Sequence, residues 1–416
     1  MTFDIKLAAA QAKAAKNAIA NLSQAQRLAL LLSVAKGLRE NVEPILAANK
    51  VDLDNAKESG LSDAMIDRLA LNADGVEAIA KAVEEIAHQP EVLGSINNIQ
   101  PLPSGIQVGK MRIPLGVIAM IYESRPNVTI DAAALCLKAG NAVILRGGKE
   151  AQASNKALAS VLHSALEAQG LPAAIATVIP VPDREVMQEM LTLSESIDLI
   201  IPRGGEGLIR YVSTNSQIPV IQHFKGVCHL FIDKDADLDK AIPILENGKT
   251  QRTGVCNALE TLLVHVDVAT QAMPKVAALF DEKGVKVHAC ERAIGYLSNA
   301  EFATKEDWEA EYLALEIAVK IVDDFDTAVT HIQEYGSGHT EVIVTENLAS
   351  SQRFMREVNS SVIMLNASSR FSDGGQLGLG AEIGISTSKL HAYGPMGAQQ
   401  LTTEKFVVYG DGHIRV

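Results

Sequence analysis

"GVIAMIYESRPNVTIDAAALCLKAGNAVILRGG", residues 116–148, contains the pattern that decides the fold of this chain. Its first and last segments, GVIAMIYE and NAVILRGG, have the length and apolar composition of buried strands. The segment between them, TIDAAALCLKAG, has the apolar spacing of a helix. A strand, a helix and a second strand in this order predict a βαβ unit with parallel strands, and therefore an α/β protein.

The same alternation extends over most of the chain. Strand-like segments recur as ATVIPV, IDLIIPRGG, PVIQHF and CHLFID, and after residue 250 as VKVHAC, EIAVKIVDDF and TEVIVTE. Residues 1 to about 95 instead show helical spacing, and LPSGIQVGKMRIPLG has the alternation and Ser-Gly turn of a β-hairpin. We therefore expect one α/β domain from residues 1–97 and 115–248 and a second from 249–385. Residues 98–114 and 386–416 are expected to form a small hairpin and tail element for oligomerisation.

Composition narrows the class of protein. The chain has 416 residues, of which 47% are hydrophobic and 21% are charged, as in globular proteins. Its formal net charge of −13 argues against nucleic acid as the main partner, because a phosphate backbone requires a basic surface. The apolar runs are too short to cross a bilayer, and no basic segment followed by an apolar one begins the chain. These features predict a cytoplasmic protein.

Two glycine-rich turns, LRGGKE (145–150) and IPRGGEG (201–207), each follow a predicted strand and precede a predicted helix. Glycine lets backbone N–H groups approach an anion, and a helix N-terminus favours negative charge. The alternative is that these are ordinary glycine turns. The residues that would bind an anionic cofactor there are Arg146, Gly147, Gly148, Lys149, Arg203, Gly204 and Gly205.

The common nucleotide-binding motifs are incomplete in this sequence. ENGKT at residues 246–250 resembles the end of a P-loop, but Pro243 stands where the motif needs its first glycine. Lys249 is therefore expected to be solvated at a helix end. Gly205 and Gly207 begin a dinucleotide-binding pattern, but Arg210 replaces its third glycine.

The cysteines are widely spaced and contain no C-x-x-C pair, which argues against a disulfide framework or a structural zinc site. Cys136, Cys228 and Cys290 lie in apolar segments and are expected in the core. Cys256 follows the flexible Gly254 and has Arg252 four residues away. A cysteine at the start of an element beside a cation favours the thiolate, so Cys256 is a candidate nucleophile. The alternative is a small buried hydrophobe.

Two further segments supply polar candidates. HIQEYGSGHT places His331 and His339 eight residues apart across a Gly-Ser-Gly turn. A metal site would need a third ligand that the local spacing does not supply, so we expect turn capping or substrate contacts and no metal. ASSRFSDGG (367–375) is a polar loop in which Arg370 is suited to bind a carboxylate or phosphate. The alternative for this loop is an ordinary exposed one.

Together these segments resemble the aldehyde dehydrogenase superfamily and, more closely, its γ-glutamyl phosphate reductase family. The blocks that carry the resemblance are YESRPNVTIDA, LRGGKEA, IPRGGEGLI, GVCNALETLLVH and VDDFDTAVTHIQEYGSGHTEVI. The resemblance implies an aldehyde dehydrogenase-like fold, with an NADP-binding domain followed by a catalytic domain that carries Cys256. It also implies NADPH-dependent reduction of L-glutamyl 5-phosphate to L-glutamate 5-semialdehyde with phosphate release, in proline biosynthesis. Cys256 would form a thioester intermediate.

The resemblance also assigns roles to other residues. Asn127, or alternatively Ser124, would stabilise the oxyanion, and Glu311 would hold the nicotinamide ribose. Gln222 or His223 stands where aldehyde-oxidising relatives have a glutamate that activates water, and its loss fits a reductase. Contacts with substrate are expected from the basic side chains Arg125, Arg252, His331, His339 and Arg370.

Cofactor choice and partners follow from the same comparison. Lys149 stands where NAD-dependent relatives have a glutamate, and a lysine would attract the 2′-phosphate of NADP(H). We expect a homodimer or higher homo-oligomer, and glutamate 5-kinase as a partner, because the acyl phosphate is labile. The alternatives are a coenzyme A-dependent or aldehyde-oxidising dehydrogenase of the same fold, or a non-catalytic scaffold.

Overall fold

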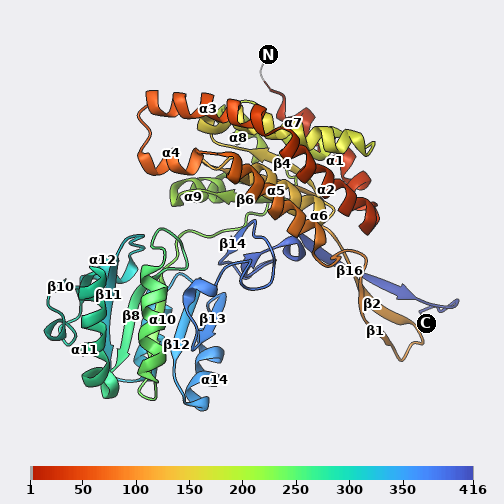
Figure 1. Ribbon diagram of the computed structural model, residues 1–416. Coiled ribbons are helices and arrows are strands. Elements are labelled where there is room, and N and C mark those ends of the chain that lie inside the picture. The colour runs from red at the N-terminus through yellow and green to blue at the C-terminus, as the bar shows by residue number, and fades with distance from the viewer. Residues whose placement is uncertain (1–2, 416) are drawn as a thin grey trace. The chain divides into compact units, whose positions relative to one another are not determined.

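The computed structural model describes residues 3–415, which divide into two compact units (Figure 1). Unit 1 comprises Met1–Gln222, Gly378–Ile385 and Met396–Val416, and unit 2 comprises His223–Leu377 and Ser386–Pro395. The division falls earlier in the chain than the predicted residue 248, because the strand and helix between residues 223 and 250 pack in the sheet of unit 2. The chain returns to unit 1 at Gly378, and the short strands β14 (Gly384–Ser386) and β15 (Gly394–Met396) contain the last two crossings between the units.

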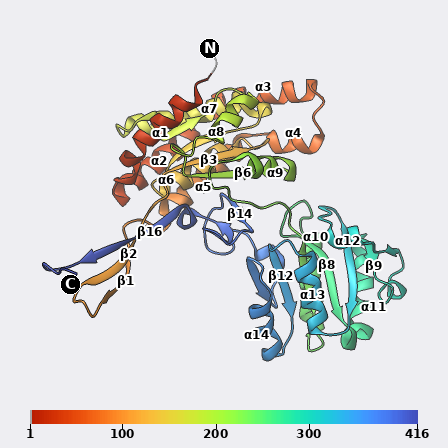
Figure 2. The same cartoon turned by 180° about the vertical axis from the view of Figure 1, so that it is seen from behind.

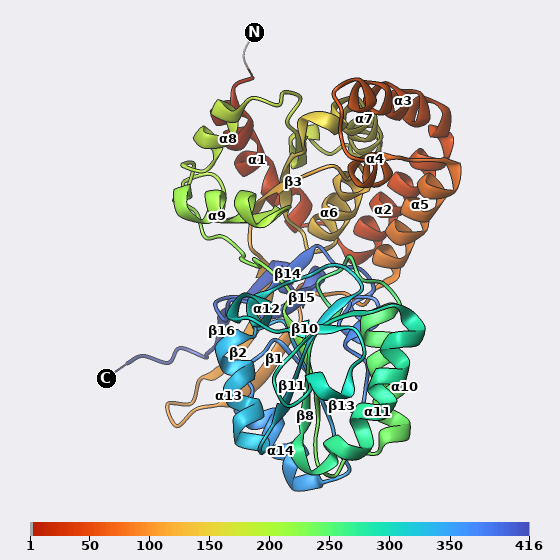
Figure 3. The ribbon, with the colours of Figure 1, turned by 90° about the vertical axis from the view of Figure 1, so that its left-hand side faces the viewer.

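Unit 1 is built on a parallel sheet in the order β5-β4-β3-β6. Its strands are β3 (Val117–Tyr122), β4 (Ala142–Arg146), β5 (Ala176–Val178) and β6 (Leu199–Arg203). Every residue of β3 is buried, because helices cover both faces of the sheet, and this explains its continuous apolar run. Figure 3 shows one set of helices on each side. One side has α1 (Ile5–Ala20) and α8 (Arg184–Met190), and the other has α6 (Asn127–Lys138) and α7 (Gln152–Ala168).

The predicted N-terminal helices are present in unit 1. They are α1 followed by α2 (Gln24–Glu40), α3 (Val42–Glu58), α4 (Asp63–Leu69) and α5 (Ala73–His88), while α9 (Glu206–Asn215) follows β6. A capping box explains where α2 begins, since Ser23 and the Gln26 side chain satisfy each other's backbone N–H groups. Helices α2 and α5 pack on each other, and α2 also packs on α7.

The hairpin and the C-terminal strand form an antiparallel sheet in the order β1-β2-β16. Its strands are β1 (Ile96–Pro101), β2 (Gln107–Pro114) and β16 (Thr402–Tyr409). The register runs from Thr402 opposite Pro114 to Tyr409 opposite Gln107, so the tail pairs with the hairpin of its own chain. The outer strand β16 exposes Phe406, Val408 and Tyr409.

Unit 2 is built on a second parallel sheet, in the order β10-β9-β11-β8-β7-β12-β13 (Figures 1 and 2). Its strands are β7 (Cys228–Ile232), β8 (Leu259–His265), β9 (Lys286–Ala289), β10 (Ala300–Phe302), β11 (Glu316–Val322), β12 (Thr340–Val344) and β13 (Val362–Leu365). Successive side chains alternate between two cores, as Leu262 and Leu263 illustrate. Leu262 faces α10 (Leu238–Thr250) and α11 (Val266–Lys283), whereas Leu263 faces α13 (Phe325–Tyr335) and α14 (Leu348–Glu357).

One predicted strand did not form. PVIQHF (219–224) makes a single β-bridge, between Val220 and Ile200, instead of a strand. Pro219 has no N–H to donate, and the segment contains the division between the units at Gln222 and His223. Among residues 3–415, helices long and apolar enough to traverse a lipid bilayer were not found.

Candidate active site

The candidate residues of unit 2 meet at the amino edge of its sheet. His223 and Gly226 precede β7, Cys256 precedes β8, Glu311 precedes β11 and His339 precedes β12. The strands β11, β8, β7 and β12 are parallel neighbours, so the segments that enter them lie side by side. This order across the sheet, which differs from the order along the chain, assembles the site.

Cys256 lies in a cluster with two histidines. The Cys256 Sγ and one ring nitrogen each of His223 and His339 all lie within 4.8 Å of one another. Cys256 and His223 are half-buried, and His339 is fully buried. The rings of His223 and His339 are tilted, with centroids 5.1 Å apart. A thiol with two imidazoles at this range has bases available to accept its proton.

The hydrogen bonds of His339 define which nitrogen carries its proton. The Thr340 hydroxyl donates to Ser372 Oγ at 2.7 Å, so its oxygen accepts from His339 Nδ1, also at 2.7 Å. Cys228 Sγ lies 3.7 Å from the same Nδ1 and donates its own proton to the Cys256 carbonyl oxygen at 3.2 Å. Nδ1 is therefore the protonated nitrogen in the neutral ring, and Nε2 is the basic one.

The backbone around Cys256 is closely packed. A Cβ on Gly226 would lie 2.1 Å from the Cys256 carbonyl oxygen and 2.7 Å from its Cα, so only glycine fits there. On the other side, Asn257 Nδ2 donates to the Ser372 carbonyl oxygen at 2.9 Å, and Ser369 Oγ donates to the Asn257 carbonyl oxygen at 2.7 Å. These contacts hold the cysteine loop against the 369–372 segment.

Two arginines give the cysteine loop a positive environment. Arg370 is half-buried and donates through Nε to Gln251 Oε1 at 2.9 Å, while Arg252 is exposed. Burial and the neighbouring Arg252 charge lower the pKa of Arg370, whereas Asp373 and Cys256 act in the opposite direction. Guanidinium groups beside a thiol favour the thiolate and attract an anionic substrate. The structure thus brings Arg252 and Arg370 together near Cys256.

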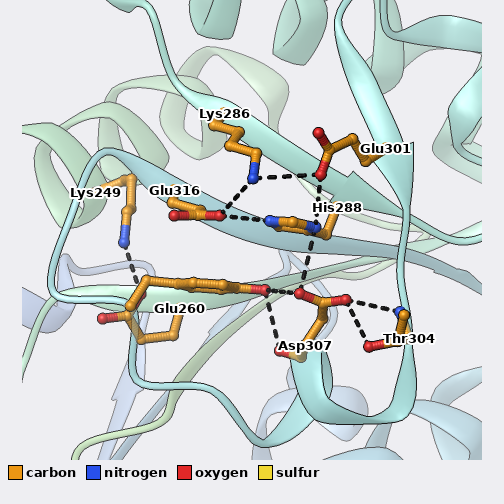
Figure 4. A network of polar contacts seen from close by, with 9 residues as sticks. Lys249, Glu260, Lys286, His288, Glu301, Thr304, Asp307 and Glu316 are labelled. Atoms are coloured by element: carbon orange, nitrogen blue, oxygen red, sulfur yellow. Dashed lines mark hydrogen bonds and ion pairs between the residues drawn. The ribbon is translucent and has the colours of Figure 1, made fainter.

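Lys249 corrects a sequence-based expectation. It is fully buried rather than solvated, and its Nζ lies 2.7 Å from Glu260 Oε2 and 2.8 Å from the Leu259 carbonyl oxygen (Figure 4). Burial lowers the pKa of Lys249 and raises that of Glu260 to about 7, because each charge has lost its water. The pair joins the end of α10 to the start of β8, and therefore fixes both ends of the loop that carries Cys256.

Glu311 also contacts this framework. Its carboxylate accepts a hydrogen bond from the Gly226 N–H at 2.9 Å, and Glu260 Oε1 accepts one from the Leu313 N–H at 3.3 Å. The adjacent Tyr312 stacks on His288 and donates to Asp307, within a network that continues through Glu316 and Lys286 (Figure 4). The turn with Glu311 is thereby connected to the cysteine loop through Gly226 and Glu260.

In unit 1, the first glycine turn borders a cavity of about 240 Å³. Gly147 and Gly148 line it together with Gln152, Asn155 and Lys156 of α7, and Lys149 is exposed beside it. A Cβ on Gly147 would lie 2.1 Å from Asn155 Nδ2, so a larger residue there would have to displace the Asn155 side chain. The half-buried Arg146 donates to the Pro182 carbonyl oxygen at 3.0 Å, and burial lowers its pKa.

The second turn already binds an anionic oxygen. The Gly205 N–H, at the start of α9, donates to Glu123 Oε2 at 3.0 Å. A Cβ on Gly205 would meet no atom within 4 Å, whereas one on Gly204 would collide with the Glu123 carboxylate at 2.5 Å. Arg203 lies 3.8 Å from Glu382. Glu123 was not among the sequence-based candidates, although it is the last residue of the predicted strand GVIAMIYE.

The two candidate oxyanion donors belong to unit 1. Asn127 donates through Nδ2 to Asp131 Oδ2 at 2.9 Å, and burial raises the pKa of Asp131 to about 6. Ser124 is buried with a φ of +36°, and its N–H and hydroxyl both donate to Glu150 Oε1, at 2.6 and 2.7 Å. Because Cys256 is in unit 2, the oxyanion role of Asn127 or Ser124 stays a prediction, as does the role of Arg125.

The structure contradicts the predicted substrate contact of His331. This side chain is only 3% exposed, because it faces inward from α13 onto the rings of Trp308 and Tyr335. Lys320 Nζ lies 3.1 Å from its Nδ1. Burial, with the charges of His229 and Lys320, lowers the pKa of His331 to about 2. His331 is a neutral core residue.

Replacing His331 by asparagine is expected to flatten the pH dependence of stability. Below pH 6.5 the unfolded chain binds a proton at His331 and the folded chain does not, so the free energy of unfolding falls as pH falls. One such group contributes up to about 1.4 kcal/mol per pH unit. Urea unfolding between pH 7 and 5 measures this slope, and His331→Asn should reduce it. The exposed His88 provides the control, His88→Asn, and an equal slope in both variants would contradict the assignment.

Comparisons with known proteins identify the family. The model of the aldehyde dehydrogenase family matches residues 2–296. γ-Glutamyl phosphate reductase of Colwellia psychrerythraea is 58% identical over 414 residues, which cover 99% of each chain. This chain belongs to the γ-glutamyl phosphate reductase family.

Other members of the family agree with that assignment. The enzyme of the same name from Idiomarina loihiensis is 60% identical over 404 residues, 97% of each chain. The crystal structure of γ-glutamyl phosphate reductase from Thermotoga maritima superposes with a TM-score of 0.97 at 40% identity, over the full length of both chains. The predicted family and the aldehyde dehydrogenase-like α/β fold are confirmed. Membership makes this chain an oxidoreductase of the aldehyde dehydrogenase type and implies a nicotinamide cofactor.

Proposed function

We propose that this γ-glutamyl phosphate reductase family member reduces L-glutamyl 5-phosphate to L-glutamate 5-semialdehyde with NADPH, releasing inorganic phosphate. The observation that carries the proposal is the Cys256 thiol, held within 4.8 Å of His223 and His339 and beside the arginine pair. The names of the relatives support the substrate, because proteins more than half identical over the whole chain are called γ-glutamyl phosphate reductases.

The first step forms a thioester on Cys256. A ring nitrogen of His339 that lies within 4.8 Å of Sγ accepts the thiol proton, and Sγ attacks the acyl carbon of the substrate. The bond between that carbon and the phosphate oxygen then breaks, and phosphate leaves with its electron pair. Arg252 and Arg370 stabilise the departing negative charge.

The second step releases the aldehyde. NADPH, when bound, supplies a hydride to the thioester carbon. The carbon–sulfur bond breaks, the aldehyde departs and Cys256 returns to the thiolate, which recovers its proton from His339. Gln222 or His223 stands where aldehyde-oxidising relatives carry a water-activating glutamate, and the loss of that carboxylate lets the thioester persist until the hydride arrives.

The residues of unit 1 fit a dinucleotide. The 240 Å³ cavity at Gly147 and Gly148 offers a hollow between strand ends and α7, and the Gly205 N–H already donates a hydrogen bond to the Glu123 carboxylate, where a phosphate oxygen would bind. Lys149 would contact the 2′-phosphate, and Glu311 of unit 2 would hold the nicotinamide ribose.

The reverse reaction tests the proposal. Phosphate-dependent reduction of NADP⁺ with glutamate 5-semialdehyde should proceed with purified protein, and coenzyme A should not replace phosphate. Equal rates with coenzyme A would favour the acylating alternative, and a rate independent of phosphate would favour an aldehyde-oxidising enzyme.

Lys149→Glu is expected to reverse the cofactor preference. A carboxylate would repel the 2′-phosphate that the ammonium attracts, so kcat/KM for NADPH should fall about 10-fold to 100-fold relative to NADH. Steady-state kinetics with both cofactors measure the ratio. Lys36→Glu makes the same charge change at an exposed lysine of α2 that does not line the cavity and is the matched control, and an unchanged ratio in Lys149→Glu would disprove the assignment.

A homo-oligomer is also proposed. The outer strand β16 leaves one edge unpaired in its sheet and exposes Phe406, Val408 and Tyr409, a surface suited to a second copy of the chain. Light scattering in solution measures the assembly. A transfer of the labile acyl phosphate from glutamate 5-kinase stays a prediction.

A further inference from the structure

We propose that Cys256, His223 and His339 form a binding site for a thiophilic divalent cation such as Zn²⁺, which reversibly masks the nucleophile. Local sequence spacing offered His339 no third ligand. The sheet order supplies two, because the segments before β7, β8 and β12 meet at one edge. The masking of catalysis rests on the proposed function, whereas the binding itself does not.

The geometry is close to that of a zinc site. Each residue offers one ligand atom, and the three atoms lie within 4.8 Å of one another. In a tetrahedral zinc site with one sulfur and two nitrogen ligands, the ligand atoms lie about 3.5 Å from one another. Side-chain rotations that move the ligand atoms by about 1 Å would therefore complete the site. The fourth position is left to water or substrate, since Cys256 and His223 are half-buried and reachable.

The hydrogen bonds around the cluster favour the tautomer and the thiol that metal binding needs. Nδ1 of His339 donates to Thr340 Oγ1, so Nε2 carries the lone pair that a metal needs. This is the arrangement by which a second partner fixes the tautomer of a metal-binding histidine. Cys228, although 3.7 Å from His339, is fully buried and donates its own proton to the Cys256 carbonyl oxygen. Cys256 is therefore the thiolate ligand.

The charges near the site set its strength. Arg252 and Arg370 favour the thiolate but repel a divalent cation, so binding should be weaker than at structural zinc sites. Both imidazoles must be neutral and the thiol deprotonated, so affinity should rise with pH. The bound ion ties up Sγ, and it should therefore compete with the acyl phosphate and with alkylating reagents.

Cobalt(II) provides the test, because its absorption reports sulfur and nitrogen ligands without turnover. Titrating Co²⁺ into the full-length protein should give one equivalent with a sulfur-to-metal charge-transfer band, which Zn²⁺ displaces. Cys256→Ser should remove the band, and His223→Ala and His339→Ala should each weaken binding at least 10-fold. Cys290→Ser, at a half-buried cysteine outside the cluster, should change neither result.

The outcomes separate the site from the reaction. A band that persists in Cys256→Ser, or an affinity unchanged in both histidine variants, would overturn the metal site, and circular dichroism verifies that each variant is folded. Zn²⁺ should also slow iodoacetamide labelling of Cys256, and a chelator should restore it. If the protein binds Co²⁺ as described but shows no phosphate-dependent reduction of NADP⁺, the proposed function fails and the metal site stands.

Discussion

Cys256→Ser is expected to abolish the reduction of L-glutamyl 5-phosphate, with kcat/KM falling on the order of 10³-fold or more. The reaction depends on the Cys256 thiolate, which forms when His339 accepts the thiol proton and which the arginine pair favours. A serine hydroxyl at the same place ionises far less readily and forms an ester, which accepts hydride poorly compared with a thioester. Steady-state kinetics with NADPH measure the loss.

The matched control distinguishes chemistry from folding. Cys290→Ser changes the same atom at a half-buried cysteine whose Sγ accepts a hydrogen bond from the Ile321 N–H, and it should retain most of the activity. Iodoacetamide at neutral pH should label Cys256, and substrate should slow this labelling. More than a tenth of the activity remaining in Cys256→Ser would show that another group is the nucleophile.

Lys249→Met is expected to destabilise unit 2 by about 3–5 kcal/mol, because it leaves the carboxylate of Glu260 buried without its partner. Both side chains of the pair are fully buried, and the Lys249 ammonium also serves the Leu259 carbonyl oxygen. Urea unfolding measures the loss. The double variant Lys249→Met/Glu260→Gln should recover at least half of it, since glutamine keeps an acceptor for the Leu313 N–H.

The pH dependence of the single variant checks the cause. Burial raises the pKa of Glu260 to about 7, above its ordinary value of 4.5. Such a group favours the folded state below pH 4.5, and this contribution is lost as pH rises through the folded value. Lys249→Met, which removes the neutralising charge, should therefore regain stability as pH falls from 7.5 toward 5.5. A double variant as unstable as the single one, or a pH-independent loss, would show that lost packing of the lysine stem dominates.

Hydrophobic patterning predicted the fold because it reports burial directly. The apolar run of β3 and the alternating cores of unit 2 follow from the same rule, that strands of a covered parallel sheet are buried on both faces. The cysteine was also visible locally, through Gly254 and Arg252. The meeting of His223 and His339 with Cys256 was not, because it depends on the order of strands across the sheet.

Two errors share one physical reason. Lys249 and His331 were read from polarity, which predicts exposure or function, but each is buried with a partner from another element. Glu260 lies only 11 residues after Lys249, yet their pairing depends on α10 packing beside the strand formed by residues 259–265. Which side chains from different elements pair with each other depends on the topology of the fold, and topology is difficult to predict from a single sequence.

The split of unit 1 constrains how the chain is made. Its last parts, Gly378–Ile385 and Met396–Val416, are synthesised only after His223–Leu377 has been synthesised. Strand β16 then pairs with β2, and the Leu401 carbonyl oxygen accepts a hydrogen bond from the buried Asn141 Nδ2 at 2.8 Å. During translation, unit 2, which contains Cys256, is therefore synthesised almost completely, except for Ser386–Pro395, before unit 1 can complete its folding. A chain that ends at residue 380 and has been released from the ribosome should be protected from proteolysis in unit 2 and remain sensitive at the hairpin of β1 and β2.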